Sequence, residues 1–368
     1  MKNILALFGG NSVEKDISVI TAIEAIGRLD RDKYKVYPVF ISDKWYLGDF
    51  EEVGQFCPFR AENYKHVALV DSVLYEVKAG KLKKVTKPDC ALLLTHGGDG
   101  ENGALQGFLE CQNVPYTSSG VLASAVGMDK IISKQAFENL ILNVPKYLTI
   151  CKSDYETSPE KTAHYIETFL DYPLIVKPSS QGSSIGINSV SSRDELFRAF
   201  DVAFCFGDKL IAERKILNFI EINCACVKRD GEIIVSEVER PISSGDILSF
   251  EDKYVGGEKT SRQLPADIEK GMASLIKAQS RRIYCELDLK GIVRFDYLLT
   301  EDMKKVYINE MNTIPGSLAN YLFEPLGIGY GELLDIIIDE AINQKKVLPK
   351  FESHVLEYFS GEKVSLKN

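Results

Sequence analysis

The chain has 368 residues, of which 45% are hydrophobic and 26% are charged, as is typical of a globular protein with two or three domains. Its formal net charge of −9, without a long basic run, argues against a nucleic-acid-binding surface. No apolar run approaches the length of a membrane span or a signal peptide, and the eight cysteines are scattered without a C-x-x-C pair. We therefore expect a cytoplasmic protein with free thiols and no membrane contact.

The first 126 residues alternate between strand and helix patterns, which predicts a mostly parallel sheet covered by helices. The helix at 18–29 follows a turn at Gly9-Gly10, and the helix at 103–113 follows a glycine-rich loop. We expect residues 1–126 to form an N-terminal α/β domain. Its predicted strands are residues 3–8, 34–42 and 90–95.

The second region, residues 127–216, is entered through a helix predicted at 124–140. Residues 172–190 have the pattern of a strand, a Gly/Ser-rich loop and a second strand, and residues 209–216 have the pattern of a further strand. These patterns predict a second small sheet in the middle of the chain.

The third region, residues 217–346, opens with two strands joined at Arg229-Asp230-Gly231, a strong hairpin signal. Residues 291–300 and 306–312 are predicted to be paired strands, and residues 330–344 an amphipathic helix.

Two segments have weak periodicity. Residues 243–265 are rich in glycine, serine and charge, and a connection of this length in a compact protein is usually a functional lid or a disordered piece. The polar tail, residues 347–368, is expected to be loosely held.

The stretch "KPSSQGSSIG", residues 177–186, combines a lysine at a strand end with a turn rich in backbone N–H and hydroxyl donors. Such a turn can fold over phosphate oxygens. It lacks the G-K-[ST] of a Walker loop, and a plain Ser/Gly hairpin is an equally good interpretation of the loop by itself. Lys177 beside it, together with Lys130 in "MDK", favours phosphate binding.

Two glycine-rich loops follow buried strands in the N-terminal region. Glu14 lies in "FGGNSVEKDIS", and His96 and Glu101 lie in "THGGDGENG". Ligands of open α/β sheets bind at the carboxyl ends of strands, where these residues are expected. Taken alone, Glu14 is better explained as a first-turn acid on a helix, and His96 as a structural histidine. A dinucleotide site is poorly supported because the third glycine of its fingerprint is missing.

The two strands of the third region carry polar residues at alternate positions. Arg294 and Asp296 share one strand face, as do Glu310 and Asn312, because side chains at i and i+2 point the same way. If the strands pair, the oxygens of Asp296, Glu310 and Asn312 converge and could hold Mg²⁺ with the phosphates of ATP. The alternatives are a surface Arg–Asp pair and a polar strand end that runs into the turn Pro315-Gly316.

Seven motifs together resemble D-alanine–D-alanine ligases of the ATP-grasp superfamily in their order and approximate spacing over roughly residues 3–345. They are "GGNSVEKDIS", "HGGDGENGALQGFLE", "MDK", "LIVKPSSQGSSIG", "EDKY", "GIVRFD" and "NEMNTIPGS". The resemblance implies an ATP-grasp fold of three α/β domains at 1–126, 127–216 and 217–346, with ATP between the second and third.

The resemblance also implies the activity. An enzyme of this family uses ATP to convert D-alanine to D-alanyl phosphate, and then joins a second D-alanine to give the dipeptide of peptidoglycan precursors. It would use two Mg²⁺ ions, with Mn²⁺ as a possible replacement, and would act as a cytoplasmic homodimer in cell-wall biogenesis. The alternative within the family is a D-alanine–D-serine ligase of the glycopeptide-resistance type.

The resemblance assigns a role to each matching residue at the nucleotide. Lys130 and Lys177 would hold the phosphates, and Ser183, Ser184 and Lys253 would assist them. The adenine and ribose end would meet Glu213 and Glu221, and the metal ligands would be Asp296, Glu310 and Asn312.

At the amino acids, Glu14 would bind the ammonium of the first D-alanine and form a hydrogen-bonded trio with Ser183 and Tyr254. His96 would lie near the carboxylate of the same D-alanine. An oxyanion hole would be formed by Arg294 and the N–H of Gly316.

The chain departs from the family at the second substrate. Tyr321 and Leu322 stand where the second carboxylate should be held, and many relatives carry a serine there. The lid reads "LSFEDKY" instead of a tyrosine-rich run. The Lys253-Tyr254 pair argues against D-lactate, but it leaves D-alanine and D-serine open.

Two other classes of function compete with the ligase. A nucleotide-binding sensor or scaffold would not need an arginine at the oxyanion position, so Arg294 argues against it. An ATP-grasp enzyme with unrelated substrates is disfavoured by Glu14 and His96 in their motifs.

Overall fold

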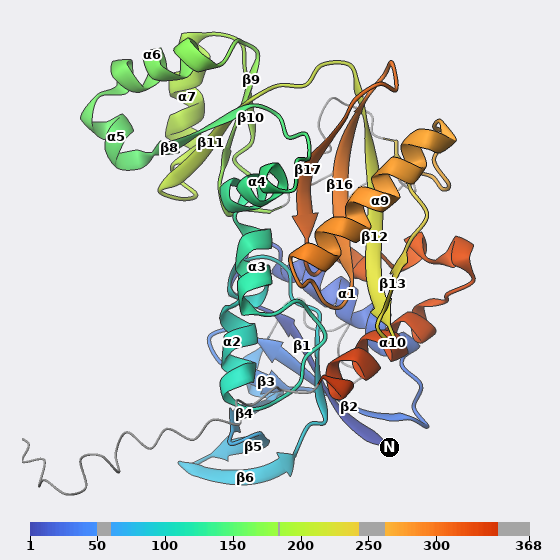
Figure 1. Cartoon of the computed structure of the whole chain (residues 1–368). Coiled ribbons are helices and arrows are strands. Elements are labelled where there is room, and N and C mark those ends of the chain that lie inside the picture. The colour runs from blue at the N-terminus through green and yellow to red at the C-terminus, as the bar shows by residue number, and fades with distance from the viewer. Residues whose placement is uncertain (50–59, 183–184, 243–261, 345–368) are drawn as a thin grey trace, which may run out of the picture.

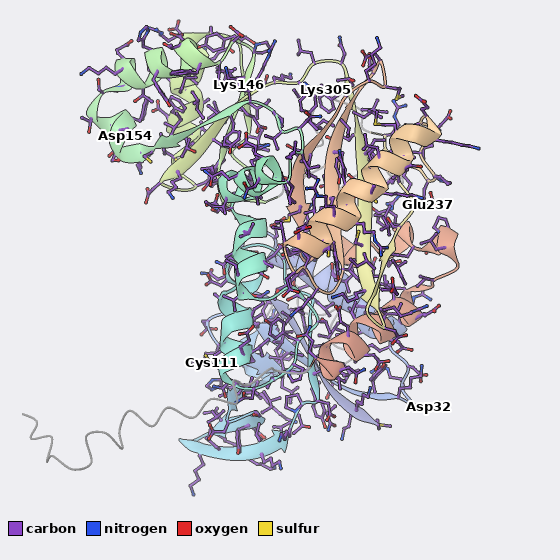
Figure 2. All side chains as sticks on the ribbon, in the orientation of Figure 1. Asp32, Cys111, Lys146, Asp154, Glu237 and Lys305 are labelled. Atoms are coloured by element: carbon purple, nitrogen blue, oxygen red, sulfur yellow. The ribbon has the colours of Figure 1, made fainter. Side chains whose placement is uncertain are left out.

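The computed structural model describes residues 1–49, 60–182, 185–242 and 262–344. These residues form one seven-stranded sheet, two four-stranded sheets and a two-stranded sheet, with helices packed against them (Figure 1). Side chains fill the layers between sheets and helices (Figure 2). Within the described ranges, no helix has both the length and the apolarity to cross a membrane.

The N-terminal sheet is mixed, with the strand order β6-β5-β4-β3-β2-β1-β7. Only the pairs β1–β2 and β1–β7 are parallel, so the prediction of a mostly parallel sheet was wrong for its outer half. The hairpins turn at Asp71-Ser72 and Ala79-Gly80, all with positive φ, and such two-residue turns allow only antiparallel pairing. The strands are β1 (Lys2–Gly9), β2 (Tyr34–Ile41), β3 (Trp45–Leu47), β4 (Lys65–Val70), β5 (Val73–Lys78), β6 (Lys81–Thr86) and β7 (Cys90–Leu93).

The core of this sheet continues into the C-terminal part of the chain. Ile4 to Phe8 of β1 are fully buried, as expected for a strand covered on both faces. The same core contains residues of helix α1 (Lys15–Arg28), of helix α10 (Tyr330–Asn343) and of the turn that includes Leu318 and Ala319. The first and last elements of the described chain therefore share one hydrophobic core.

The predicted helix at 124–140 is two helices, α3 (Val121–Met128) and α4 (Lys130–Asn139), which follow helix α2 (Ala104–Cys111). Asp129 separates them because its backbone is extended and its Oδ1 caps α4, accepting from the N–H groups of Ile131 at 2.9 Å and Ile132 at 3.1 Å. Lys130 is consequently the first residue of α4.

The central sheet has the order β10-β9-β11-β8, and its strands pair antiparallel. It confirms the predicted strands on both sides of the Gly/Ser-rich loop and the strand that follows. It has a hydrophobic core of its own. Its elements are β8 (Tyr147–Cys151), β9 (Leu174–Pro178), β10 (Asn188–Val190), β11 (Lys209–Arg214), α5 (Lys152–Thr157), α6 (Pro159–Phe169) and α7 (Arg193–Ala203).

The third sheet has the order β13-β12-β16-β17, and the predicted pairing of β16 with β17 is confirmed. The predicted hairpin is also confirmed, with Asp230 at φ 51° and Gly231 at φ 87°. Phe137 and Leu142 pack into the core of this sheet, which places α4 beside it. The elements are β12 (Phe219–Arg229), β13 (Glu232–Val235), β16 (Val293–Thr300), β17 (Val306–Asn312), helix α9 (Lys270–Glu286) and the short pair β14 (Arg240–Pro241) and β15 (Arg262–Gln263).

Short 3₁₀ segments complete the described fold at Ala61–Asn63, Gly98–Gly100, Gly316–Leu322 and Glu324–Leu326. The domain limits at 126/127 and 216/217 remain predictions: the first falls inside α3 and the second between β11 and β12. Most of the predicted lid, and the whole tail 347–368, lie outside the described residues.

The cap between α3 and α4 can be tested by stability. We expect Asp129→Ala to lower the free energy of unfolding by about 0.5–2 kcal/mol, because two N–H groups of α4 lose their acceptor. Asp129→Ser keeps an acceptor oxygen and should stay close to the wild type. Urea unfolding followed by circular dichroism measures both, and equal destabilisation by the two variants would argue against the cap.

Candidate active site

A cavity of about 670 Å³ lies among the start of α1, the loop after β7, the loop after β9, strands β12, β16 and β17, and the turn after β17. Its size is in the usual range for small-molecule sites. The residues expected here that line it are Glu14, His96, Glu101, Lys130, Glu221, Arg294, Asp296, Glu310, Asn312, Gly316 and Tyr321, and Gly182 of the Gly/Ser-rich loop lines it as well.

Some predicted residues lie elsewhere. Lys177 and Glu213 are buried and are not among the residues that line the cavity. Leu322 is fully buried in the N-terminal core and is not among the residues that line the cavity, and its role at the second carboxylate stays a prediction. Ser183, Ser184, Lys253 and Tyr254 are outside the described residues.

The pairing of β16 with β17 brings four polar side chains together. Asp296 stands opposite Glu310, and Arg294 opposite Asn312. The Arg294 guanidinium donates to Asp296 through Nε at 2.6 Å and through a terminal nitrogen at 2.8 Å, and Asn312 Nδ2 donates to the same carboxylate at 3.0 Å. Two carboxylates directly opposite each other repel, which favours a cation between or beside them.

This oxygen set fits a hard divalent cation held jointly with phosphates. Among the described residues, no group of three or more His, Cys, Asp or Glu side chains forms a metal site by itself. Asp296, Glu310 and the amide of Asn312 supply only part of an octahedral shell, and Mg²⁺ commonly takes the rest from water and phosphate oxygens.

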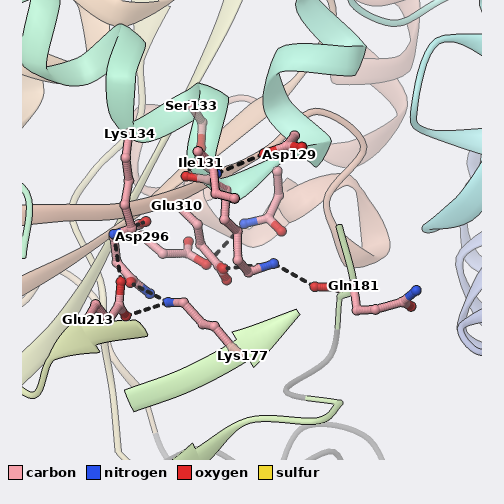
Figure 3. A network of polar contacts seen from close by, with 12 residues as sticks. Asp129, Ile131, Ser133, Lys134, Lys177, Gln181, Glu213, Asp296 and Glu310 are labelled. Atoms are coloured by element: carbon pink, nitrogen blue, oxygen red, sulfur yellow. Dashed lines mark hydrogen bonds and ion pairs between the residues drawn. The ribbon is translucent and has the colours of Figure 1, made fainter. Parts of the chain in front are cut away.

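Lysines surround a buried carboxylate next to the cavity (Figure 3). Lys177 Nζ lies 2.6 Å from Glu213 Oε1, and Lys134 Nζ lies 3.1 Å from Oε2. Lys177 and Lys134 also reach Asn309, through its side-chain oxygen at 3.5 Å and its carbonyl at 3.4 Å. We call Lys134, Lys177, Glu213 and Asn309 the lysine cluster.

The lysine cluster carries a net positive charge on buried side chains. Burial alone would raise the pKa of Glu213, but the ammonium groups of Lys134 and Lys177 outweigh it and lower that pKa. Burial lowers the pKa of Lys134, and Glu213 counteracts it. With two lysines on one carboxylate, one positive charge is left over, which suits a polyphosphate.

Lys130 bridges two parts of the fold at the cavity wall. Its Nζ donates to the carbonyl of Gln181 at 2.5 Å and lies 3.8 Å from Glu310 Oε2 (Figure 3). Burial lowers its pKa, and Glu310 opposes the shift. The start of α4 is thereby linked both to the Gly/Ser-rich loop and to β17.

Glu14 precedes α1 and lies against two glycine segments. A Cβ added to Gly97 or Gly182 would come within 2.5 Å or 2.4 Å of Glu14 Oε2, so a side chain at either position would displace the carboxylate. Gly97 also has φ +65°, which favours glycine. Glu14 makes no side-chain capping hydrogen bond to α1, so helix capping does not account for its orientation.

His96 is buried, and both of its ring nitrogens are engaged. Nδ1 lies 2.8 Å from the carbonyl of Ile314, which can only accept, so Nδ1 carries the proton. Nε2 lies 2.8 Å from Thr21 Oγ1, and that oxygen accepts from the N–H of Ser317 at 3.1 Å. Burial lowers the pKa of His96, although Glu14 opposes the shift, so the ring is neutral.

Glu101 also holds the turn after β17, which contains Ile314 and Ser317. Its Oε1 accepts from the N–H groups of Thr313 and Ile314, each at 3.1 Å, and its Oε2 accepts from the N–H of Gly97 at 3.0 Å. Burial raises the pKa of Glu101, and these donors oppose the shift. We call residues 313–319 the Gly316 turn.

The Gly316 turn contains three consecutive left-handed residues, Ser317, Leu318 and Ala319, with φ between 47° and 50°. Each such non-glycine residue costs about 1–2 kcal/mol. Burial of Leu318 and Ala319 in the N-terminal core offsets this cost, together with the Thr21 contact and the hydrogen bond from Asn320 Nδ2 to the Ser317 carbonyl at 2.8 Å.

The sequence reasoning assigned no role to several residues of the site. Thr21 lies seven positions after Glu14, and therefore on the same face of α1, a spacing that could have identified it. Lys134 lies one helical turn after Lys130 in the same way. Glu101 was expected at the sheet edge with Glu14 and His96, but its contact with the turn after β17 was not predicted. Glu239 and Arg262 gave no local signal, because their partners are distant in the chain.

Comparison with known proteins identifies the family. A family model described as "D-ala D-ala ligase N-terminus" matches residues 3–119, and one described as "D-ala D-ala ligase C-terminus" matches residues 136–339. The chain is 36% identical to the D-alanine–D-alanine ligase of Thermosipho africanus over 94% of this chain and 95% of that protein. It is 34% identical to the enzyme of Bacillus cytotoxicus over 94% of this chain and 97% of that protein.

Solved structures agree with these relatives. The D-alanine–D-alanine ligase from Coxiella burnetii superposes with a TM-score of 0.78 at 26% identity and covers 93% of this chain and 94% of its own. The VanG D-Ala:D-Ser ligase from Enterococcus faecalis has the same TM-score at 28% identity, with 92% and 98% covered.

The His96 network predicts a tautomer and a titration. At pH 7, ¹⁵N NMR of the imidazole should show Nδ1 protonated and Nε2 bare, and the ring should stay neutral as the pH falls through 6.5. The unfolded chain protonates His96 at a higher pH than the folded chain does, because burial lowers the pKa of the folded imidazole. The contribution of neutral, buried His96 to the free energy of unfolding is therefore lost as the pH falls below about 6.5. Titration at or above 6.5 would contradict the network.

Proposed function

The chain belongs to the D-alanine–D-alanine ligase family, and on this premise we propose how its cavity performs the reaction. The protein is an ATP-dependent ligase that joins two D-alanine molecules into the dipeptide of peptidoglycan precursors. The observation that supports the proposal best is that one cavity gathers Glu14, Lys130, Arg294 and the carboxylates of Asp296 and Glu310 from distant parts of the chain.

The first step activates a carboxylate, which is a poor electrophile. Phosphoryl transfer from ATP to D-alanine requires chiefly positioning and charge neutralisation. We propose that the phosphates are bound by Lys130, which lines the cavity, and by Lys177 of the adjoining lysine cluster, whose positive charges exceed its negative charge. A divalent metal ion, which we propose to be Mg²⁺ in two copies, would be held by Asp296, Glu310 and Asn312 and would supply further neutralisation of phosphate charge.

The resemblance places Glu213 and Glu221 at the adenine and ribose end of the nucleotide. We propose a different role for each of them. Glu221 lines the cavity on β12, which supports a contact with the ribose. Glu213 is the carboxylate of the lysine cluster, so we propose that it positions Lys177 instead of reaching the adenine by itself. Roles for Ser183, Ser184, Lys253 and Tyr254 stay predictions from the resemblance.

The first D-alanine is proposed to bind with its ammonium on Glu14 and its reacting carboxyl between Arg294 and the N–H of Gly316. Neutral His96 adds no charge to the carboxyl; it fixes the Gly316 turn through Ile314 and Thr21. Preorganised donors of this kind act where negative charge develops. The amine of the second D-alanine then forms the new C–N bond, and phosphate leaves with the electrons of the broken C–O bond.

We also propose a cytoplasmic homodimer. The seven cysteines in the described ranges are all free thiols. Val13, Ile20 and Ile23, in or beside α1, expose 42–54% of their surface, which supports an apolar contact between copies. Light scattering of the purified protein measures the molar mass in solution and so distinguishes a dimer from a monomer.

The activity is tested with purified protein, ATP, Mg²⁺ and D-alanine. We expect release of phosphate with formation of the D-alanyl-D-alanine dipeptide, and loss of both on chelation of the metal. The second candidate, a D-alanine–D-serine ligase, is raised by the VanG likeness. Mass spectrometry of the products with both amino acids present separates the two, and a strong excess of the mixed dipeptide would overturn the first.

The oxyanion role of Arg294 predicts a large kinetic effect. We expect Arg294→Ala to lower kcat by about 100- to 1000-fold, as for loss of a donor to a developing oxyanion. Arg281→Ala is the matched control, because that arginine lies on α9 and does not line the cavity. Near-normal turnover by Arg294→Ala would refute the assignment.

A further inference from the structure

The second amino acid brings a carboxylate into a cavity dominated by acids. Three basic side chains among the described residues, Lys130, Arg262 and Arg294, line it. The acids that line it are Glu14, Glu24, Glu101, Glu221, Glu239, Asp296 and Glu310. An incoming carboxylate without a cation of its own would be repelled, because unpaired like charges in a confined site cost free energy.

Two of the three cations already contact other groups of the site. Arg294 is hydrogen-bonded through two nitrogens to Asp296 and stands at the reacting carboxyl. Lys130 donates to the Gln181 carbonyl and faces Glu310 on the phosphate side of the cavity.

Arg262 is held in position, and its contacts with the described residues leave N–H donors available. Its guanidinium carbon lies 3.9 Å from the centre of the Tyr321 ring, a stacking that fixes the plane of the group. Its ion pair with Glu239 is long, 3.7 Å from Nε to Oε1. A guanidinium has five N–H donors, so a carboxylate can still be bound through two of them.

Tyr321 connects this arginine to the reacting centre. It belongs to the same 3₁₀ segment as Gly316, and its hydroxyl donates to Glu239 Oε2 at 2.9 Å. Glu239 is itself buried and is held by Asn223, whose Nδ2 lies 3.4 Å from the same oxygen. The Tyr321 ring therefore fixes the position of Arg262 by stacking, while the Tyr321 hydroxyl is hydrogen-bonded to Glu239.

We propose that Arg262 binds the carboxylate of the second amino acid, supported by Tyr321 and Glu239, and thereby restricts the acceptor to amino acids with a free α-carboxylate. The inference rests on the ligase reaction proposed above. In an α-amino acid one carbon separates amine and carboxylate, so an amine directed at the carbon beside Arg294 and Gly316 leaves its carboxylate close by. Among the described residues, Arg262 is the remaining cation of the cavity lining, and it stacks on Tyr321 of the segment that begins at Gly316.

The test uses competition between two acceptors, D-alanine and D-alaninamide, which differ only in the charge of the carboxyl group. Full-length protein is incubated with ATP, Mg²⁺, D-alanine and D-alaninamide, and mass spectrometry quantifies the dipeptide and the dipeptide amide. We expect the wild type to favour D-alanine, and Arg262→Gln to lower the ratio of acid to amide product at least about tenfold, with the amide product maintained. Arg262→Lys should keep part of the preference.

Arg240→Gln is the matched control, since this arginine lies on β14, the partner strand of β15, and does not line the cavity. Its product ratio should equal that of the wild type. An unchanged ratio in Arg262→Gln, or an equal fall of both products, overturns the inference while the ligase activity of the wild type stands. A wild type that makes neither product overturns the proposed function, and this inference with it.

Discussion

Hydrogen bonds to the Gly316 turn from helix α1 and the loop after β7 are the constraint on which the rest of the site depends. His96 holds Ile314, Glu101 holds Thr313 and Ile314, and Thr21 holds Ser317, and these partners are 212 to 296 residues apart in the chain. The turn has three left-handed residues that would not keep this shape alone. Because the loop after β7 and helix α1 supply the bonds, the part of the cavity where we propose that the amino acids bind is built jointly by the N-terminal sheet region and the turn after β17.

Charge organises the opposite side. The lysine cluster and Lys130 concentrate positive charge next to β17, whereas the carboxylates of Asp296 and Glu310 face each other across the β16–β17 pair. Asp296 is paired with Arg294, and Glu310 lies 3.8 Å from Lys130, so the positive and negative groups adjoin each other. We propose that a nucleotide with its divalent metal ion would bind here, with its phosphates at the lysines and the metal at the carboxylates.

The sequence predicted those parts of the fold that depend on local pattern. The β16–β17 pair with its polar residues at alternate positions, the Asp230-Gly231 hairpin and the strands around the Gly/Ser-rich loop were all readable, because period and turn chemistry determine them. Strands β3 to β6 were missed, since their hairpins turn on Asp71-Ser72 and Ala79-Gly80, which are weak signals. The partnership of Glu213 with two lysines was unreadable, because it depends on how α4 meets the central sheet.

The central sheet has a core of its own, while α4 packs with the third sheet, and α4 meets the central part of the chain through polar contacts. Lys130 donates to the Gln181 carbonyl and Lys134 pairs with Glu213, so these polar contacts join α4 to the central sheet. The side chains of Lys134 and Glu213 are only 0% and 6% exposed, so salt screens their ion pair little. A phosphate that binds Lys130 or Lys177 would meet the same side chains that join α4 to the central sheet.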